Sequence, residues 1–315
     1  MKTTPMRTNE SAAGSTRLLH RLTAALLALV LAASAALPVF AADTAPTDTI
    51  YINSVSDLLA FADKCGFDQW SKGKTVILQE DLSLEDTEWA PVASFSGAFK
   101  GNGHTISDVS LVGAYSPAGF FGILEEGGSI QDLTIKGVVN PAGTQKTAGG
   151  LVGTNYGTII NCTFSGAVHG EEEAGGLVGR NETSGTIDHS TSRAMVSGAY
   201  ATGGIVGYNM RVKTKFCINR GEIVSAARGV EEGSDRYCQE MAGGICGMAK
   251  GDVMCCDNFG SVTTRGHAYS LTAGICGSAH ESLTVGDCDN FAPVTSVSTY
   301  QASVGGIVGL SGRPV

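Results

Sequence analysis

Helical periodicity and tight hairpin turns are both scarce in this sequence of 315 residues. The intervals between its recurring glycine motifs show no helical spacing, which argues against leucine-rich and helical repeats. Asn-Gly turns between alternating runs are rare, and this argues against propellers and sandwiches. What is left to explain is a glycine-rich chain, with 43 glycines, that reads as short strands.

A basic excess is also lacking. Residues 1–42 hold four basic residues and one acidic residue, so their removal moves the net charge from −9 to about −12. Nucleic-acid binding requires a basic surface, and we therefore expect no nucleic-acid partner. Beyond the N-terminal segment there is no second long apolar run. The mature chain is accordingly predicted to have no membrane span and to be soluble and exported.

The N-terminal segment resembles a targeting sequence. Arg17 and Arg21 precede an apolar run from Leu22 to about Leu37, and Val39-Phe-Ala41 offers a small-residue cleavage site. This pattern predicts a signal peptide over residues 1–42 and a secreted or extracellular protein, either free or attached to the cell surface. An uncleaved membrane anchor is the alternative, although the apolar run is short for a span.

A five-residue motif, Gly-Gly-Leu/Ile-x-Gly, recurs through the chain at intervals of about thirty residues, which is typical of solenoids. Its copies are Gly149–Gly153, Gly175–Gly179, Gly203–Gly207, Gly243–Gly247 and Gly305–Gly309, with looser copies at Gly119–Gly122 and Gly274–Gly277. Each is followed by a second half-motif with strand-like alternation, as in Gly157-Thr-Ile159-Ile-Asn-Cys162 before Gly166-Ala-Val168. An interval of this length accommodates three short strands and three turns, so we predict a parallel β-helix of six or seven coils.

Stacking the repeats aligns equivalent residues in columns. Two columns are predicted to face the core: Leu133, Cys162, Ser190, Cys217, Cys256, Cys288; and Phe121, Val152, Val178, Val206, Cys246, Cys276, Val308. A third contains Asn219, Asn258 and Asn290, whose amides can form a hydrogen-bonded ladder along the stack. A row of ligand-binding side chains is the alternative interpretation of these asparagines.

These motifs resemble the GLUG repeat of large bacterial cell-surface proteins, which also occurs in the stalks of streptococcal IgA-specific metallopeptidases. The resemblance covers about residues 95–315, where several copies keep both half-motifs in order. It implies a right-handed parallel β-helix used as a surface module, and it implies no single activity. The resemblance does not imply peptidase activity for this chain, because His280-Glu281 is followed by Thr284 at the position where the zinc-peptidase motif requires a second histidine.

Residues 43–94 are predicted to cap the solenoid. Ile50–Asn53 is typical of a strand, Ser54 and Asp57 are helix-capping residues, and Ser56–Cys65 has amphipathic helical spacing. Strands are expected at Val76–Leu78 and Leu82–Leu84.

The chain ends just after the motif Gly305–Gly309, so we expect residues 95–315 to be truncated at the C-terminus. Further C-terminal coils or domains of a longer chain would complete it, or a partner would.

Nine cysteines in an exported chain would ordinarily suggest disulfides. Their places in the core columns instead favour free buried thiols that act as small hydrophobic residues. Metal binding is not supported, because Cys255-Cys256 lacks a spaced partner pair.

The candidate binding residues are all acidic. Asp257 and Asp289 occupy equivalent outward positions in successive coils, and such a pair could hold a cation, with Ca²⁺ as the candidate. A second set is expected in loops at one corner: Glu171, Glu172, Glu173, Glu231, Glu232, Asp235.

No catalytic motif is complete, so no catalytic residue or cofactor is assigned. The sequence therefore predicts a non-catalytic stalk or adhesin that binds glycans or surface proteins. The alternative is a β-helix polysaccharide lyase or hydrolase with an acidic site on one outer face, for which Arg228 and Arg236 are the candidate bases.

Overall fold

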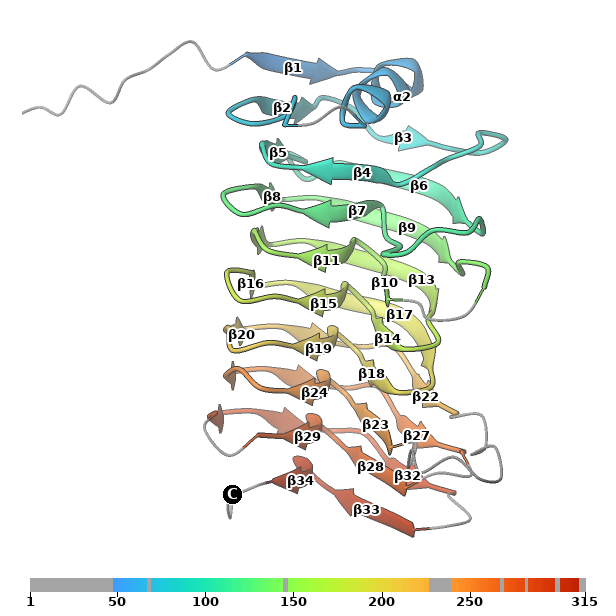
Figure 1. The fold of residues 1–315 in the computed structure, drawn as a ribbon, viewed down its shortest axis with the longest axis vertical. Coiled ribbons are helices and arrows are strands. Elements are labelled where there is room, and N and C mark those ends of the chain that lie inside the picture. The colour runs from blue at the N-terminus through green and yellow to red at the C-terminus, as the bar shows by residue number, and fades with distance from the viewer. Residues whose placement is uncertain are drawn as a thin grey trace, which may run out of the picture. The chain divides into compact units, whose positions relative to one another are not determined.

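The computed structural model describes residues 48–66, 69–143, 147–226, 239–266, 269–280, 283–297 and 301–311. Within these residues the chain is a parallel β-solenoid of successive coils (Figure 1). Every strand pairs in parallel with the equivalent strand of the coil before or after it, and the pairing stays in register from coil to coil apart from one shift between Ile106 and Val109. The prediction of a parallel β-helix is confirmed, and the predicted signal peptide, residues 1–42, lies outside the described residues.

Four sheets run along the stack. The first has nine strands: β1 (Thr49–Ile52), β2 (Thr75–Leu78), β5 (Ala98–Lys100), β8 (Ser129–Gln131), β12 (Thr158–Ile160), β16 (Thr186–Asp188), β20 (Thr214–Lys215), β25 (Val253–Met254) and β30 (Val285–Gly286). The second has eight, one for each of eight coils: β4 (Val92–Phe95), β7 (Phe121–Leu124), β11 (Val152–Asn155), β15 (Val178–Asn181), β19 (Val206–Asn209), β24 (Cys246–Ala249), β29 (Cys276–Ala279) and β34 (Val308–Ser311).

The third sheet has eleven strands: β3 (Leu82–Ser83), β6 (Thr105–Leu111), β9 (Thr134–Val139), β13 (Thr163–His169), β17 (Thr191–Gly198), β21 (Ile218–Asn219), β22 (Ile223–Ser225), β26 (Asp257–Asn258), β27 (Val262–Thr264), β31 (Asp289–Asn290) and β32 (Val294–Ser296). The fourth has six: β10 (Thr147–Gly149), β14 (Glu173–Gly175), β18 (Ala201–Gly203), β23 (Gln239–Gly243), β28 (Tyr269–Ala273) and β33 (Gln301–Gly305).

The six-stranded sheet corrects the prediction of three strands per coil. The Gly-Gly pair of each motif lies at a bend that separates a strand of this sheet from one of the eight-stranded sheet, as between β10 and β11. At Gly150 a β-carbon would lie 2.3 Å from the Phe164 ring and 2.5 Å from the carbonyl oxygen of Gly176. Only glycine fits this close approach. The motif therefore marks a corner of the coil, and coils from residue 147 onward have at least four strands.

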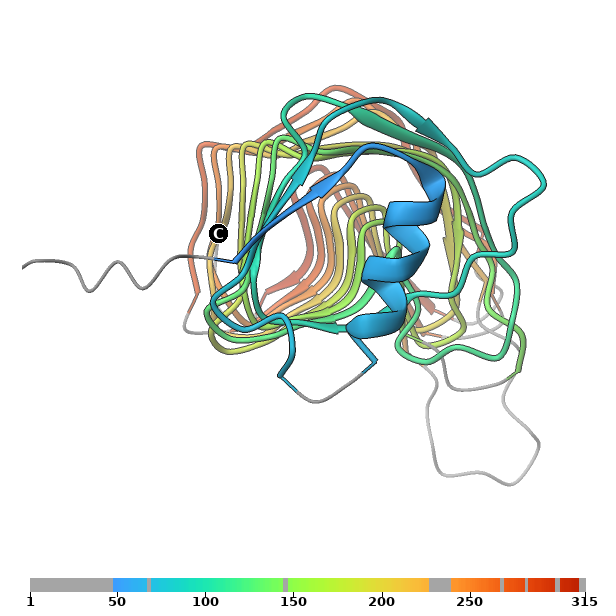
Figure 2. The ribbon, with the colours of Figure 1, turned by 90° about the horizontal axis from the view of Figure 1, so that it is seen from above.

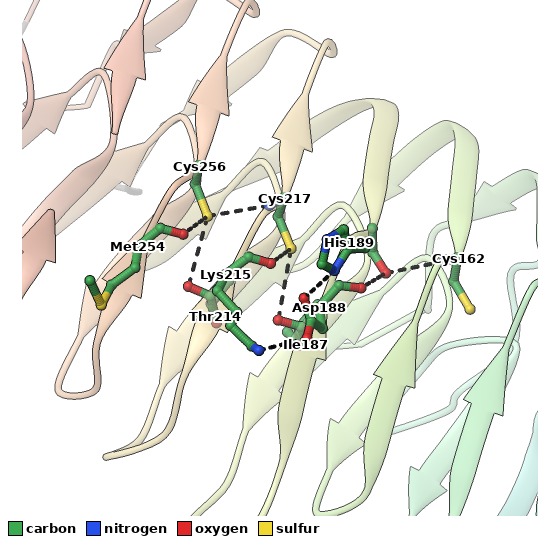
Figure 3. A network of polar contacts seen from close by, with 10 residues as sticks. Cys162, Ile187, Asp188, His189, Thr214, Lys215, Cys217, Met254 and Cys256 are labelled. Carbon is green, nitrogen blue, oxygen red and sulfur yellow. Dashed lines mark hydrogen bonds and ion pairs between the residues drawn. The ribbon is translucent and has the colours of Figure 1, made fainter. Parts of the chain in front are cut away.

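The core columns face inward as predicted. In the column that begins at Phe121, neighbouring strands pair in register through Val152, Val178, Val206, Cys246, Cys276 and Val308. In the column that contains Cys217, its backbone N–H donates to Sγ of Cys256 at 3.4 Å (Figure 3). The backbone N–H of Cys256 donates to Sγ of Cys288 at the same distance. Within the described residues eight cysteines are free, which confirms the prediction of free thiols there, and Cys238 lies outside them.

Two asparagine ladders run inside the stack. The predicted one is confirmed: Nδ2 of Asn219 donates to Oδ1 of Asn258, and Nδ2 of Asn258 to Oδ1 of Asn290, both at 2.8 Å. A second ladder was not predicted. It joins Asn155, Asn181 and Asn209 at 2.7 and 2.9 Å, at the end of strands in the eight-stranded sheet. Its signal in the sequence is an asparagine two residues after the last glycine of three successive motifs.

One helix is present in the described part of the chain, α2 (Val55–Lys64), close to the predicted Ser56–Cys65. Ser54 caps it by accepting a hydrogen bond from the backbone N–H of Asp57 at 3.2 Å. Phe61 is buried, and its ring centroid lies 5.7 Å from that of Phe95 and 5.9 Å from that of Phe99. Figure 2 shows the helix lying across the N-terminal end of the ring of strands.

The central amide of the second ladder should matter most for stability. Asn181→Ala removes a fully buried side chain that accepts from Asn155 and donates to Asn209. Its loss leaves polar atoms of both neighbours unpaired, and we expect the free energy of unfolding to fall by about 2–4 kcal/mol. Urea unfolding measures the change. The exposed control Asn140→Ala should change it by less than about 0.5 kcal/mol, and an equal effect of the two variants would contradict the ladder's role.

The buried thiols should resist alkylation. Burial raises the pKa of the Cys65 and Cys162 thiols to about 12, so little thiolate exists at pH 8. We expect iodoacetamide to leave both unmodified in the folded chain and to modify both in guanidinium, as read by peptide mass mapping. Protection that persists in guanidinium without reductant would instead indicate disulfides.

Candidate functional site

Asp257 and Asp289 lie side by side in successive coils, as predicted. They are register partners on β26 and β31, which are neighbours in the eleven-stranded sheet. Because Asn258 and Asn290 point inward in their ladder, the alternation of the strand directs the two aspartates outward. Asp257 is half-buried and Asp289 is exposed. The two carboxylates therefore form an outward acidic pair.

An aromatic pair that sequence reasoning missed flanks these carboxylates. The rings of Phe259 and Phe291 stack with centroids 4.7 Å apart and an interplanar angle of 11°. On the other side, the guanidinium of Arg220 lies 4.6 Å from the centroid of the Phe259 ring. Phe259 is covered on both faces and is still 41% exposed, so the edge of its ring faces solvent. The signal in the sequence was the residue that follows each asparagine of the predicted ladder.

We call these five residues the outer strip: Arg220, Asp257, Phe259, Asp289 and Phe291. It runs along three successive coils, which stack at about 4.8 Å. Its carboxylates can accept hydrogen bonds from hydroxyl or ammonium groups, and its ring edges offer apolar contact. The strip therefore presents polar and apolar groups together on one surface.

The predicted acidic corner is assembled only in part. Glu171 is half-buried and Glu172 is exposed, in the turn between β13 and β14, but Glu173 is 3% exposed. It accepts hydrogen bonds from both Nε of Arg180, at 2.7 Å, and Nη2. The prediction that all three carboxylates lie in a loop is thus wrong for Glu173, which is the first residue of strand β14. Glu231, Glu232 and Asp235 lie outside the described residues, as do Arg228 and Arg236.

The pairing of Glu173 follows from its burial, because a covered carboxylate needs charged or hydrogen-bonding partners. Thr147 donates a further hydrogen bond to it at 3.1 Å. The hydrogen bond to Glu173 raises the pKa of Arg180, whose guanidinium also lies 4.8 Å from the centroid of the Tyr208 ring. This arrangement explains Glu173 as a structural ion pair that ties β14 to β15.

A polar network links the cysteine column to the surface (Figure 3). Asp188 contacts Nζ of Lys215 at 2.9 Å and Nδ1 of His189 at 2.5 Å. The imidazole of His189 in turn stacks on the ring of Phe216 with centroids 4.7 Å apart. His189 and Phe216 both have left-handed backbone, with φ of 46° and 53°, at the corner between the nine- and eleven-stranded sheets. These side chains neutralise and cover one another, which is typical of a structural corner.

Within the described residues no three His, Cys, Asp or Glu side chains are placed to hold a metal ion together. No helix in that part of the chain combines the length and the apolar character needed to cross a membrane. The Asp257–Asp289 pair offers two carboxylates to a cation.

Comparison with known proteins agrees with this geometry. The family model of the GLUG motif matches residues 144–168. Halomucin from Haloquadratum walsbyi is 36% identical over 144 residues, which is 41% of this chain and 2% of halomucin. The chain thus spans a very small part of that relative.

Among solved structures, a candidate immunoglobulin A1 protease from Bacteroides ovatus aligns with a TM-score of 0.58. The alignment covers 82% of this chain and 84% of that one at 19% identity, a level that shows the fold alone. The GLUG motif is matched at residues 144–168, and its glycine pattern recurs along the coils of this chain.

Proposed function

We propose that this chain is an exported, non-catalytic surface module that acts as a stalk and carries an adhesive face for glycans or surface proteins. The observation that carries the proposal is the outer strip, where the edge of a stacked aromatic pair and two outward carboxylates face solvent together. An acidic pair alone would be an ordinary solvated surface. The adjoining apolar edges make this one suited to a partner with both polar and apolar groups.

The stalk role follows from the way the coils are joined. From residue 147 onward each coil is bonded to its neighbours through four sheets, and the buried amide ladders add side-chain bonds in the same direction. Eight coils at about 4.8 Å each give a stack of roughly 35–40 Å. Such a stack holds its surface residues at fixed spacings, which suits repeated weak contacts to an extended ligand.

Export and the hand of the coil belong to the same proposal. The pattern of residues 1–42 supports secretion by a signal peptide. A right-handed coil is the hand that parallel strand connections almost always take. We further propose that α2 caps the solenoid, because it places Phe61 against Phe95 and Phe99 at the first coils.

The cap can be tested on the two faces of α2. Phe61→Ala removes a buried ring, and we expect the free energy of unfolding to fall by about 3–5 kcal/mol. It should also cause concentration-dependent association, measured by light scattering, because the first strands lose cover. Leu59→Ala on the exposed face of the same helix is the control and should do neither. Destabilisation without association would argue against a cap.

The adhesive face is tested by binding the full chain to a glycan array and to surface-protein extracts, with calcium and with chelator. We expect binding without cleavage, and Phe259→Ala with Asp257→Asn should weaken it by about ten-fold or more. Phe216→Ala, an exposed and stacked phenylalanine at another corner, is the matched control and should retain binding.

Cleavage of a bound glycan, found by product analysis, would contradict the non-catalytic role and favour the lyase or hydrolase alternative. If the outer-strip variant binds as well as the unmodified chain, the glycan or protein partner is bound at a surface other than the outer strip.

A further inference from the structure

A basic cleft lies at a corner of the solenoid that the outer strip does not reach. It has a volume of about 500 Å³, within the range of small-ligand sites. It is formed where the chain passes from the eight-stranded to the nine-stranded sheet, in three successive coils. The side chains that line it include Arg211, Lys213, Lys250, Asp252, His280 and Leu283.

The charge of this cleft is opposite to that of the whole chain, which has a net charge of −9. Arg211, Lys213 and Lys250 form no ion pair with any carboxylate among the described residues. Among the described residues of the lining, the one carboxylate is that of Asp252, which accepts a hydrogen bond from the backbone N–H of Thr284 at 2.9 Å. This contrasts with Arg180, whose charge is balanced by Glu173 and Glu182. Three cations in an acidic protein are thus left facing one cleft.

The loops that carry these cations are held from inside the core. Nδ2 of Asn209, the last residue of the second ladder, donates to the carbonyl oxygen of Val212 at 3.0 Å and to that of Gly251 at 3.3 Å. Val212 lies between the two cations of the first loop, and Gly251 follows Lys250. A β-carbon on Gly251 would lie 2.2 Å from the backbone of Val212, so the two loops touch. A buried amide therefore sets the spacing of the cations before any ligand arrives.

Lys250 has a second constraint. Its ammonium lies 5.4 Å from the centroid of the Tyr208 ring, and the side chain is half-buried. Cation–π contact of this kind restricts a lysine without neutralising it. The cost of ordering the side chain on binding is thereby reduced.

We propose that this cleft binds an anionic polysaccharide, through sulfate or carboxylate groups that contact Arg211, Lys213 and Lys250. A polymer is favoured over a single anion because the cations are spread over two coils, with Arg211 and Lys213 in one and Lys250 in the next, about 4.8 Å along the direction of stacking. Leu283 adds an apolar contact for a sugar ring. The inference rests on the proposed role as a glycan-binding surface module but concerns a different face and a different class of glycan.

Nucleic acid is also a polyanion, but the observations favour it less. Its recognition relies on an extended basic surface, whereas the unpaired cations lie together at one corner of a net acidic chain. It enters as an outcome of the test.

The test measures the affinity of the full chain for defined probes by biolayer interferometry. Dextran sulfate and polygalacturonate carry sulfate and carboxylate groups, and binding of either supports the proposal and identifies the group. We expect uncharged dextran to bind at least about ten-fold more weakly than the charged probe, and added salt to weaken the interaction. Equal binding of dextran, tighter binding of single-stranded DNA, or full competition by millimolar inorganic sulfate would each overturn it.

Variants locate the site. Arg211→Gln with Lys213→Gln and Lys250→Gln should weaken binding of the charged probe by about ten-fold or more. The matched control, Lys136→Gln with Arg193→Gln and Arg265→Gln, removes the same charge from exposed positions elsewhere and should retain binding. Equal loss in both variants would mean unspecific charge attraction and overturn the site. Thermal unfolding checks that both fold.

The outer-strip variant separates this inference from the proposed function. It should leave binding of the charged probe unchanged, because its residues line the other face. If the charged probe binds at the cleft and no glycan binds at the outer strip, the cleft proposal is supported and the adhesive role of the strip is contradicted. If a glycan binds at the strip and the charged probe does not bind at the cleft, only the cleft proposal is overturned.

Discussion

In-register stacking of parallel coils is the constraint on which the rest of this molecule depends. Each residue lies about 4.8 Å from its equivalent in the next coil, so a side chain is followed by the same kind of side chain along the whole stack. Inside, this arrangement favours columns of valine, cysteine and phenylalanine that are buried against one another. It also favours a buried polar residue whose neighbours in the column can bond to it.

The asparagine ladders meet this condition. A lone buried amide would cost free energy, but each amide here donates to the next and also bonds a backbone carbonyl or N–H at its corner. Where the second ladder ends, alanine takes the position in the next coils, with Ala249 in register with Asn209. The amide of Asn209 therefore donates to the carbonyl oxygens of Val212 and Gly251 in the corner loops. In this way a buried side chain positions the loops that line the basic cleft.

The same stacking rule gives the surface its chemistry. Residues that face outward also form columns, so two carboxylates or two phenylalanines can be gathered without any special loop. The outer strip is made this way. The basic cleft is made differently, from the corner loops of successive coils. A solenoid can therefore present carboxylates on one surface, for hydroxyl or ammonium groups, and cations on another, for anions.

The sequence by itself determined the repeat, the inward columns, the predicted asparagine ladder and the adjacency of Asp257 and Asp289. Each of these follows from a period in the chain, and a period is visible without a structure. Only the tertiary structure decided the fourth sheet, the covering of Glu173 by Arg180, the stacking of Phe259 on Phe291 and the gathering of three cations at one corner. These depend on where the corners fall and on which way side chains turn there. That direction is set by backbone bends and by contacts between coils about thirty residues apart, and no local pattern encodes it.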